Sequence, residues 1–196
     1  MTRFRFAACA AVAAALLAGV GSSHAQGGAP VAPTEVAQFD FLIGQWDIEV
    51  SPKVNSLVAM IHGTPHLAGS WKAWRAFDGF GVDDEVRVVD GGGNPINLSR
   101  ALRVYDAKAH RWVVETLDVY SARFGAATAQ WQGGEMQVTG NGVMPDGKAY
   151  LSRSRFYEIA PDHFKMRQDR SYDNGATWEE GAIAITAKRV AAKAQR

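Results

Sequence analysis

The segment from residue 82 to 88 places one carboxylate, Asp84, among apolar residues of the same parity. Its even positions read Val, Asp, Val, Val, whereas its odd positions read Asp, Glu, Arg. Because alternate residues of a strand point to opposite faces, Asp84 is predicted to share the buried face with the valines. A buried charge needs a partner, and Arg103 is the predicted one, with Arg153 and Arg155 behind it. The pattern fits a polar anchor of a ligand pocket, a general base, or an ion pair that only fixes strand register.

Tyr120 is a second candidate, because a phenol can donate a proton to a ligand oxygen. It lies near Asp118 and Arg123 at the predicted end of a strand. A turn with solvated charges accounts for the same residues. The sequence therefore leaves a catalytic and a purely structural role open for this tyrosine.

Two histidines, His62 and His66, lie in a long interval between predicted strands, from residue 53 to 67. The apolar run 57–61 fits either a lid over a binding site or an additional strand. In such a lid, His62 is a candidate catalytic residue and His66 a candidate ligand contact. The glycine and the proline between the two histidines interrupt any helix that would bring the imidazoles together, so no metal site is predicted.

Three of the six tryptophans, Trp71, Trp74 and Trp112, are candidates for lining a pocket for a flat ligand. Large aromatic residues equally fill a protein core. Trp71 and Trp74 differ in parity, so at most one of them faces the interior unless a bulge intervenes. The sequence has no glycine-rich phosphate loop, nucleophile elbow, dinucleotide fingerprint or His-Glu-x-x-His motif, and no cofactor is predicted.

Short β-strands must position these candidates. From residue 45 onward, turn signals rich in Gly, Pro, Asn and Asp separate runs of Val, Trp, Tyr, Phe and Thr. The predicted strands are 45–51, 68–77, 80–89, 97–105, 111–118, 126–131, 135–141, 149–158, 163–171 and 178–188. No long helical pattern supplies the crossovers that parallel strands need. We therefore expect an all-β fold, an up-and-down antiparallel β-barrel of about ten strands, with a two-sheet sandwich as the alternative.

The first residues predict export. Arg3 and Arg5 precede an apolar stretch, 6–20, that is too short to span a membrane and is followed by small residues. The predicted signal peptide is 1–25, which places the mature protein in the periplasm or outside the cell. Cys9, the single cysteine, lies within it. The mature chain therefore has no thiol for disulfides, cysteine-ligated metals or thiol catalysis.

The mature chain is predicted to consist of a leader, 26–38, one domain, 39–190, and a tail, 191–196. Thr34 is expected to cap a short helix that stops at Gly44. The formal net charge is only +1, which argues against nucleic-acid binding. We expect a small-molecule ligand, no nucleic acid, no membrane span in the mature chain, and a monomer or weak homodimer.

The segment 39–46, Phe-Asp-Phe-Leu-Ile-Gly-Gln-Trp, resembles the Gly-x-Trp start of lipocalin-like (calycin) barrels. The chain also resembles an uncharacterised bacterial family of such secreted barrels in three further segments, 77–84, 102–106 with Trp112, and 171–178. The resemblance covers residues 39–189. It implies a short helix that closes one end of the barrel and a Trp46 that plugs the floor, and it implies no activity.

The segment 171–178 also fits the Asp-box pattern, Ser-x-Asp-x-Gly-x-Thr-Trp, which recurs once per blade in sialidase-like propellers. Here it occurs once, and the chain is too short for such a propeller. We interpret it as a turn. Asp173 is expected to accept hydrogen bonds from backbone amides, Gly175 to adopt a positive φ, and Trp178 to pack beneath the turn.

These observations favour the binding of a small, largely apolar or aromatic molecule in the barrel lumen, anchored by Asp84 and Arg103. The alternative is a cofactor-independent lyase, isomerase or cyclase that uses Asp84 as acid or base, with Tyr120 or a lid histidine as its partner. A purely structural envelope protein is a third possibility, and it predicts a lumen filled by side chains.

Overall fold

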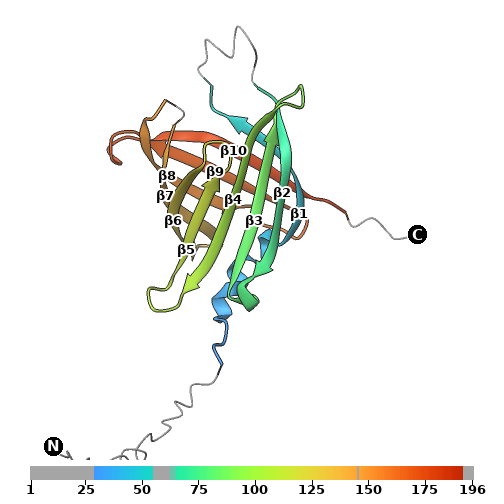
Figure 1. The fold of residues 1–196 in the computed structure, drawn as a ribbon, viewed down its shortest axis with the longest axis vertical. Coiled ribbons are helices and arrows are strands. Elements are labelled where there is room, and N and C mark those ends of the chain that lie inside the picture. The colour runs from blue at the N-terminus through green and yellow to red at the C-terminus, as the bar shows by residue number, and fades with distance from the viewer. Residues whose placement is uncertain (1–28, 55–62, 64, 145, 192–196) are drawn as a thin grey trace, which may run out of the picture. The chain divides into compact units, whose positions relative to one another are not determined.

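The computed structural model describes residues 29–54, 63, 65–144 and 146–191, and the barrel is built from residues after Val31. Ten antiparallel strands close into a barrel in the order β1-β10-β9-β8-β7-β6-β5-β4-β3-β2 (Figure 1). The strands are β1 Gly44–Pro52, β2 Leu67–Ala76, β3 Gly81–Val89, β4 Pro95–Asp106, β5 Arg111–Asp118, β6 Arg123–Gln132, β7 Glu135–Val143, β8 Ala149–Tyr157, β9 His163–Ser171 and β10 Glu179–Arg189. The predicted up-and-down barrel is confirmed, and the sandwich alternative is wrong.

Tight turns with specific side-chain chemistry join consecutive strands. Between β3 and β4, Asp90 Oδ1 accepts hydrogen bonds from the amides of Gly92 and Asn94, both at 2.9 Å. The side chain of Asn94 also donates to Asp90, and these bonds lower the pKa of the Asp90 carboxyl. Between β6 and β7, Gly133 and Gly134 adopt φ values of 61° and 83°, which a two-residue hairpin turn requires. Because these turns depend on local residue types, the sequence predicts approximately where the strands end.

Helix η1, a 3₁₀ helix over Thr34–Leu42, packs into one end of the barrel. The predicted cap is wrong: Pro33 occupies the N-cap position, and the Thr34 hydroxyl donates to the side chain of Glu35 instead. The helix ends at Leu42, and Gly44 starts β1 with a φ of 129°. A second 3₁₀ helix, η2 over Phe77–Gly79, joins β2 to β3 at the same end of the barrel.

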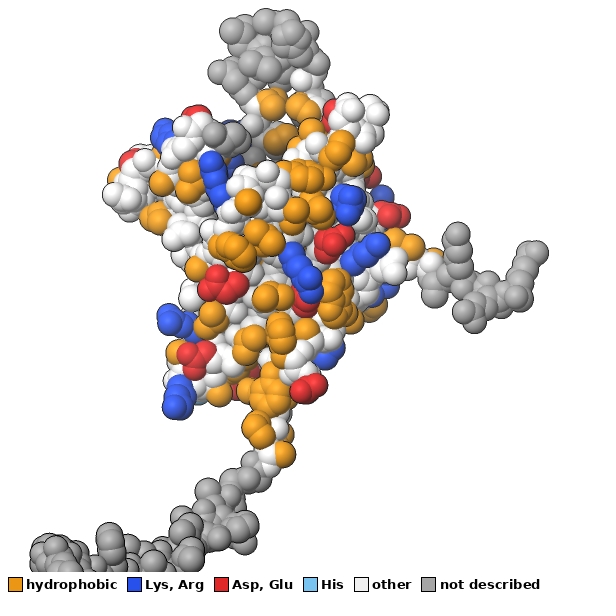
Figure 2. All heavy atoms as spheres, viewed as in Figure 1, with side chains coloured by type: hydrophobic (Ala, Val, Ile, Leu, Met, Phe, Trp, Pro, Cys, Tyr) orange, Lys and Arg blue, Asp and Glu red, His pale blue; other side chains and the backbone are white. Residues whose placement is uncertain are grey.

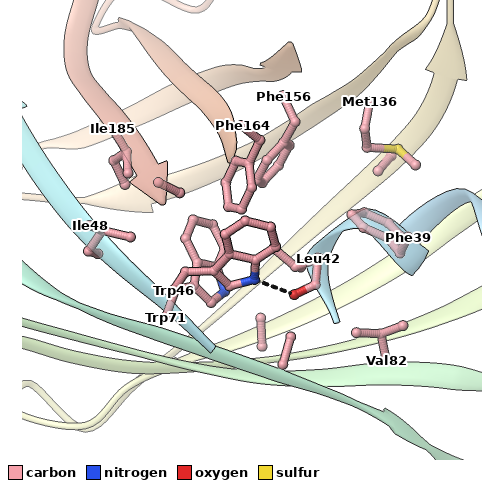
Figure 3. Close-up of a cluster of buried hydrophobic side chains, with 14 of the residues drawn as sticks. Phe39, Leu42, Trp46, Ile48, Trp71, Val82, Met136, Phe156, Phe164 and Ile185 are labelled. Atoms are coloured by element: carbon pink, nitrogen blue, oxygen red, sulfur yellow. Dashed lines mark hydrogen bonds between the residues drawn. The ribbon is translucent and has the colours of Figure 1, made fainter. Parts of the chain in front are cut away.

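Aromatic side chains fill the end of the barrel that η1 closes (Figure 3). Trp46 is fully buried, and its indole Nε1 donates to the carbonyl of Leu42 at 2.8 Å. The ring of Phe39 lies edge-on to Trp112, with centroids 4.7 Å apart, and Phe164 packs edge-on to Trp46 at 4.8 Å. This aromatic cluster is the floor of the barrel, as the resemblance implied for Trp46.

Arg189, the last residue of β10, connects this aromatic floor to the first and last strands of the barrel, β1 and β10. Its guanidinium carbon lies 4.0 Å from the centre of the Trp46 ring. The guanidinium also donates to the carbonyl of Ile43 at 2.8 Å and to the carbonyl of Pro161. It approaches Gly44 so closely that a Cβ at that position would collide with it. A single side chain therefore connects η1, β1, β10 and the β8–β9 connection.

The β9–β10 connection forms the turn that the Asp-box pattern predicted. Asp173 Oδ1 accepts the amide of Thr177 at 2.9 Å, and Gly175 adopts a φ of 91°. Trp178 Nε1 donates to the Gly175 carbonyl at 3.2 Å. Hydrogen bonds from the side chain and amide of Thr177, and from the Ser171 hydroxyl, lower the pKa of Asp173 to about 2. The motif is thus a hydrogen-bonded turn in this barrel.

The outer surface mixes charges of both signs. Acidic and basic side chains are interspersed over the face of the barrel shown in Figure 2. Neither η1 nor η2 is long and apolar enough to cross a membrane, in the part of the chain that the structure describes. β1 ends at Pro52 and β2 starts at Leu67, and the expected lid or extra strand between them falls mostly on residues 55–62, outside the described residues.

Candidate functional site

The lumen contains a cavity of about 580 Å³ above the aromatic floor. Its walls are mainly aliphatic and include Val50, Val86, Val88, Val114, Met166 and Ile185. It extends along the barrel to the strand ends opposite η1, where Pro52, Leu67 and Ile96 line it. Volumes of about 300 to 1,000 Å³ are typical of small-molecule sites. The barrel is therefore not filled by its own side chains.

Asp84 on β3 and Arg103 on β4 form a buried ion pair at the closed end of this cavity. Only 1% of Asp84 and 6% of Arg103 is exposed. Asp84 Oδ2 contacts Arg103 Nη1, while Asp84 Oδ1 accepts a hydrogen bond from Trp71 Nε1 at 3.0 Å. Within the described residues, Oδ2 and Nη1 have no hydrogen-bond partner beyond this ion pair. Both carboxylate oxygens are therefore engaged by protein donors.

The register of two neighbouring strands brings the two charges together. Asp84 lies opposite Ala101, so Arg103 is its diagonal neighbour two residues along β4 and on the same face. The adjacent Asp83 points to the outer face, where it accepts a hydrogen bond from Arg100 Nε at 2.8 Å. Two consecutive aspartates thus enter two different ion pairs on opposite sides of the sheet, as strand alternation dictates.

The guanidinium of Arg103 lies between the cavity and helix η1. Its central carbon is 5.2 Å from the centre of the Phe39 ring. Burial lowers the pKa of Arg103 to about 10, so the side chain stays protonated at neutral pH. The floor of the cavity therefore carries two charges of opposite sign and no net charge.

Arg170 on β9 also lines the cavity, near the strand ends opposite η1, as do Arg100 and Asp118 among the charged residues. Its Nε donates to Gln168 Oε1 at 2.9 Å, and its Nη1 contacts the sulfur of Met144 at 3.3 Å. Its guanidinium carbon lies 4.6 Å from the centre of the Tyr150 ring. Arg170 was not among the predicted site residues: the sequence left open whether Asp169 or Arg170 faces the lumen, and the parity of Arg170 with Phe164 on the same strand was a usable signal.

The three candidate tryptophans lie in three different places. Trp71 lines the cavity and is held by Asp84. Trp112 is fully buried in the closed end and donates to Gln38 Oε1 at 3.0 Å. Trp74 lies on the outer face and is 41% exposed, with the guanidinium of Arg100 5.6 Å from its ring centre. Of these three tryptophans, Trp71 alone lines the cavity.

Arg153 does not lie behind Arg103 as expected. It is on the outer face of β8, where it forms a salt bridge to Asp169 at 2.9 Å and lies 4.4 Å from the centre of the Trp178 ring. Strand alternation is the reason, because Ser152 and Ser154 take the cavity-facing positions on either side of it. Arg155, two residues along the strand from Arg153, shares its outward orientation and is likewise exposed.

Of the remaining residues singled out in the sequence, Asp118 lines the cavity, whereas Tyr120 and His66 do not. Tyr120 lies in the turn after β5 and is 52% exposed, with its amide donating to Asp118. His66 is exposed just before β2, and His62 lies outside the described residues. The described residues contain no group of three or more His, Cys, Asp or Glu side chains that could hold a metal ion.

Comparison with known proteins gives a fold and no family. No family model matches the chain, and no curated protein matches its sequence. Among solved structures, the S-type phycobiliprotein lyase CPES from Guillardia theta matches with a TM-score of 0.55 and 9% sequence identity. The match covers 80% of this chain and 92% of the lyase. The protein is therefore a ten-stranded antiparallel β-barrel of lipocalin-like fold, similar in structure to that lyase.

Proposed function

We propose that the protein binds a small, largely apolar or aromatic molecule in the lumen, with the Asp84–Arg103 pair as the polar anchor at the floor. One observation carries this proposal: a cavity of about 580 Å³ with aliphatic walls ends at a buried, oriented ion pair. Apolar walls supply affinity by excluding water, and a few fixed polar groups select the orientation of the ligand.

Arg103 is suited to the anchoring role because a guanidinium has five N–H donors. One of its nitrogens is committed to Asp84, and Phe39 covers one face of the group. A carbonyl or hydroxyl oxygen of a ligand at the floor can accept from the remaining donors. The pair is already neutral, so such a ligand needs no charge at this end.

The geometry favours binding over catalysis. Both oxygens of Asp84 already accept from Trp71 and Arg103, which leaves this carboxylate poorly placed to take a proton from a substrate. The predicted partner Tyr120 is exposed in a turn. A lyase of similar fold keeps a cofactor-independent lyase, isomerase or cyclase as the alternative. The cavity itself argues against a purely structural envelope protein.

Native mass spectrometry of the protein purified from its own host tests the proposal. We expect a bound small molecule on the wild type. Val138 lines the cavity, so Val138→Trp should remove this adduct by filling the lumen. Gln137 is the neighbouring exposed residue of β7, and Gln137→Trp is the matched control that should retain the adduct.

Three results would change the conclusion. An adduct that survives Val138→Trp lies outside the lumen. An adduct that is unaffected by Asp84→Asn is not anchored at the floor. Chemical conversion of the released molecule by the wild type, abolished in Asp84→Asn with binding retained, would support the enzyme alternative.

We also propose that residues 1–25 are removed during export, on the pattern of basic, apolar and small residues in that segment. The intact mass of the protein from its own host tests this proposal. A mature chain that begins at Gln26 supports it, and a full-length chain in the cytoplasm contradicts it.

A further inference from the structure

Three arginines line the cavity, and they differ in their electrostatic surroundings; one of them, Arg100, pairs with Asp83. Arg103 at the floor is paired with Asp84. Arg170, at the other end, is half-buried and has no carboxylate within 4.0 Å among the residues that the structure describes. Glu179 lies opposite Arg170 in the strand register but forms no ion pair with it there. The charge of Arg103 at the floor is thus neutralised by Asp84, whereas Arg170 forms no salt bridge within the described residues. Asp118 also lines the cavity and supplies a carboxylate there.

Neutral groups hold the guanidinium of Arg170 in place. Gln168 accepts from Nε, the Met144 sulfur contacts Nη1, and the Tyr150 ring lies under the guanidinium. The Gln168 side chain is itself held by the Ser154 hydroxyl at 3.4 Å. These contacts orient the cation without cancelling its charge, which is the arrangement of an anion-binding group.

A second cation, Lys148, is connected to this group through two aromatic rings. Lys148 Nζ is 4.4 Å from the centre of the Tyr172 ring, and Tyr172 packs edge-on to Tyr150 with centroids 6.1 Å apart. Two carboxylates accept hydrogen bonds from turn amides: Asp118, which also lines the cavity, accepts the amides of residues 120 and 121, and Asp146 accepts the amide of Lys148. Neither carboxylate forms a salt bridge with Arg170 or Lys148 within the described residues.

We propose that the ligand is an amphipathic anion whose carboxylate or other oxyanion head binds Arg170 at the mouth, while its apolar body extends along the lumen toward Asp84 and Arg103. This inference rests on the proposed binding function and specifies the class of ligand. A guanidinium donates two parallel hydrogen bonds to an oxyanion, and a half-buried guanidinium gains more from that contact than a fully solvated one. The aliphatic walls between the two ends match an apolar body.

Two fluorescent probes that differ only in charge provide the test. Anilinonaphthalene is neutral, and its sulfonate is an anion of nearly the same size and shape. We expect the wild type to bind the sulfonate about tenfold more tightly or better, the ratio that one charge-assisted contact supplies. Arg170→Met keeps the aliphatic stem and removes the charge, so it should abolish the preference and leave affinity for the neutral probe within about twofold.

Arg153→Met is the matched control, because Arg153 is an arginine of the neighbouring strand that points outward. It should keep the preference of the wild type. Val138→Trp should displace both probes and so establish that they occupy the lumen. Arg170→Gln serves as a second charge-removing variant if Arg170→Met does not fold, and the probe preference of the wild type is informative without either variant.

The outcomes separate this inference from the proposed function. Equal affinity of the wild type for both probes, or a preference that persists without the Arg170 charge, overturns the anion proposal while lumenal binding stands. Failure of the wild type to bind either probe in the lumen overturns the binding function as well. A sulfonate preference that disappears only in the Arg170 variants supports both.

Discussion

Replacing Arg103 by methionine should lower the free energy of unfolding far more than the same replacement of Arg155, an arginine on the outer face. The change leaves Asp84 buried beneath the cavity, with Trp71 as its remaining donor among the described residues. Removing one partner of a buried ion pair costs about 3–5 kcal/mol, because the other charge loses its compensation. Methionine retains most of the apolar stem, so the effect is chiefly electrostatic.

The magnitude follows from burial. Asp84 and Arg103 are 1% and 6% exposed, so water does not replace the lost contact. Glu135 and Arg155 form the comparison pair on the outer face, where their side chains are 30% and 47% exposed. Water reaches both partners, and Arg155→Met should lower the free energy of unfolding by only about 1 kcal/mol or less.

A double-mutant cycle measures the coupling within the buried pair. Urea unfolding followed by tryptophan fluorescence gives the free energy of unfolding for the wild type, Asp84→Asn, Arg103→Met and the double variant. The two single variants should each lose about 3–5 kcal/mol. The double variant buries no charge, so we expect it to be less destabilised than the sum of the single variants by about 3 kcal/mol or more.

Additivity would refute this reasoning. If the losses of the two single variants sum to the loss of the double variant within about 0.5 kcal/mol, the two charges do not stabilise each other. Equal effects of Arg103→Met and Arg155→Met would refute the argument from burial. Either result would also remove the basis for treating the pair as a fixed anchor.

Two further changes test other contacts. Gly44→Ala should lower the free energy of unfolding by about 1–3 kcal/mol in thermal unfolding, because Gly44 has a φ of 129° and a Cβ would meet the Arg189 guanidinium. Gly134→Ala, with a φ of 83° and open space around the Cβ, is the control, and an equal loss in both would show that the approach of Arg189 is unimportant. Asp173→Asn should lower the free energy of unfolding at neutral pH and remove the pH dependence that the Asp173 carboxyl contributes. The pKa of Asp173 is lowered to about 2, so its contribution is present above the usual carboxyl pKa and is lost as the pH falls through the folded value. The difference in urea stability between wild type and Asp173→Asn should therefore be larger at about pH 6 than at about pH 2, and a difference that does not depend on pH would contradict this assignment.

The strands and the inward orientation of Asp84 could be predicted because both follow from local rules. Turn residues such as those at 133–134 mark strand ends, and parity assigns a face to each residue between them. The same rule explains the error at Arg153. Parity along β8 groups Arg153 with Arg155, opposite to the apolar Phe156, so both arginines belong outside.

Contacts between strands far apart in the sequence could not be predicted. The position of Arg189 over Trp46 depends on the pairing of β1 with β10, which closes the barrel. The contact of Arg170 with Tyr150 lies between the consecutive strands β8 and β9 and depends on their exact register. Parity suffices to place Arg170 inside the barrel, but neither parity nor composition shows that it lacks a carboxylate partner there. The prediction that Thr34 caps the helix was wrong for a different reason. η1 is a 3₁₀ helix whose position is set by the tertiary packing of Phe39 and Leu42.

The pairing of β1 with β10 has a consequence for biosynthesis. β1 is among the first strands to leave the ribosome, yet its partner on one side is the last strand to be made, and Arg189 completes the junction. Until then a nascent sheet has two free edges, which are the places where β-rich chains aggregate. The growing polypeptide therefore depends on remaining unfolded, or on a chaperone that covers those edges, until translation has passed residue 189.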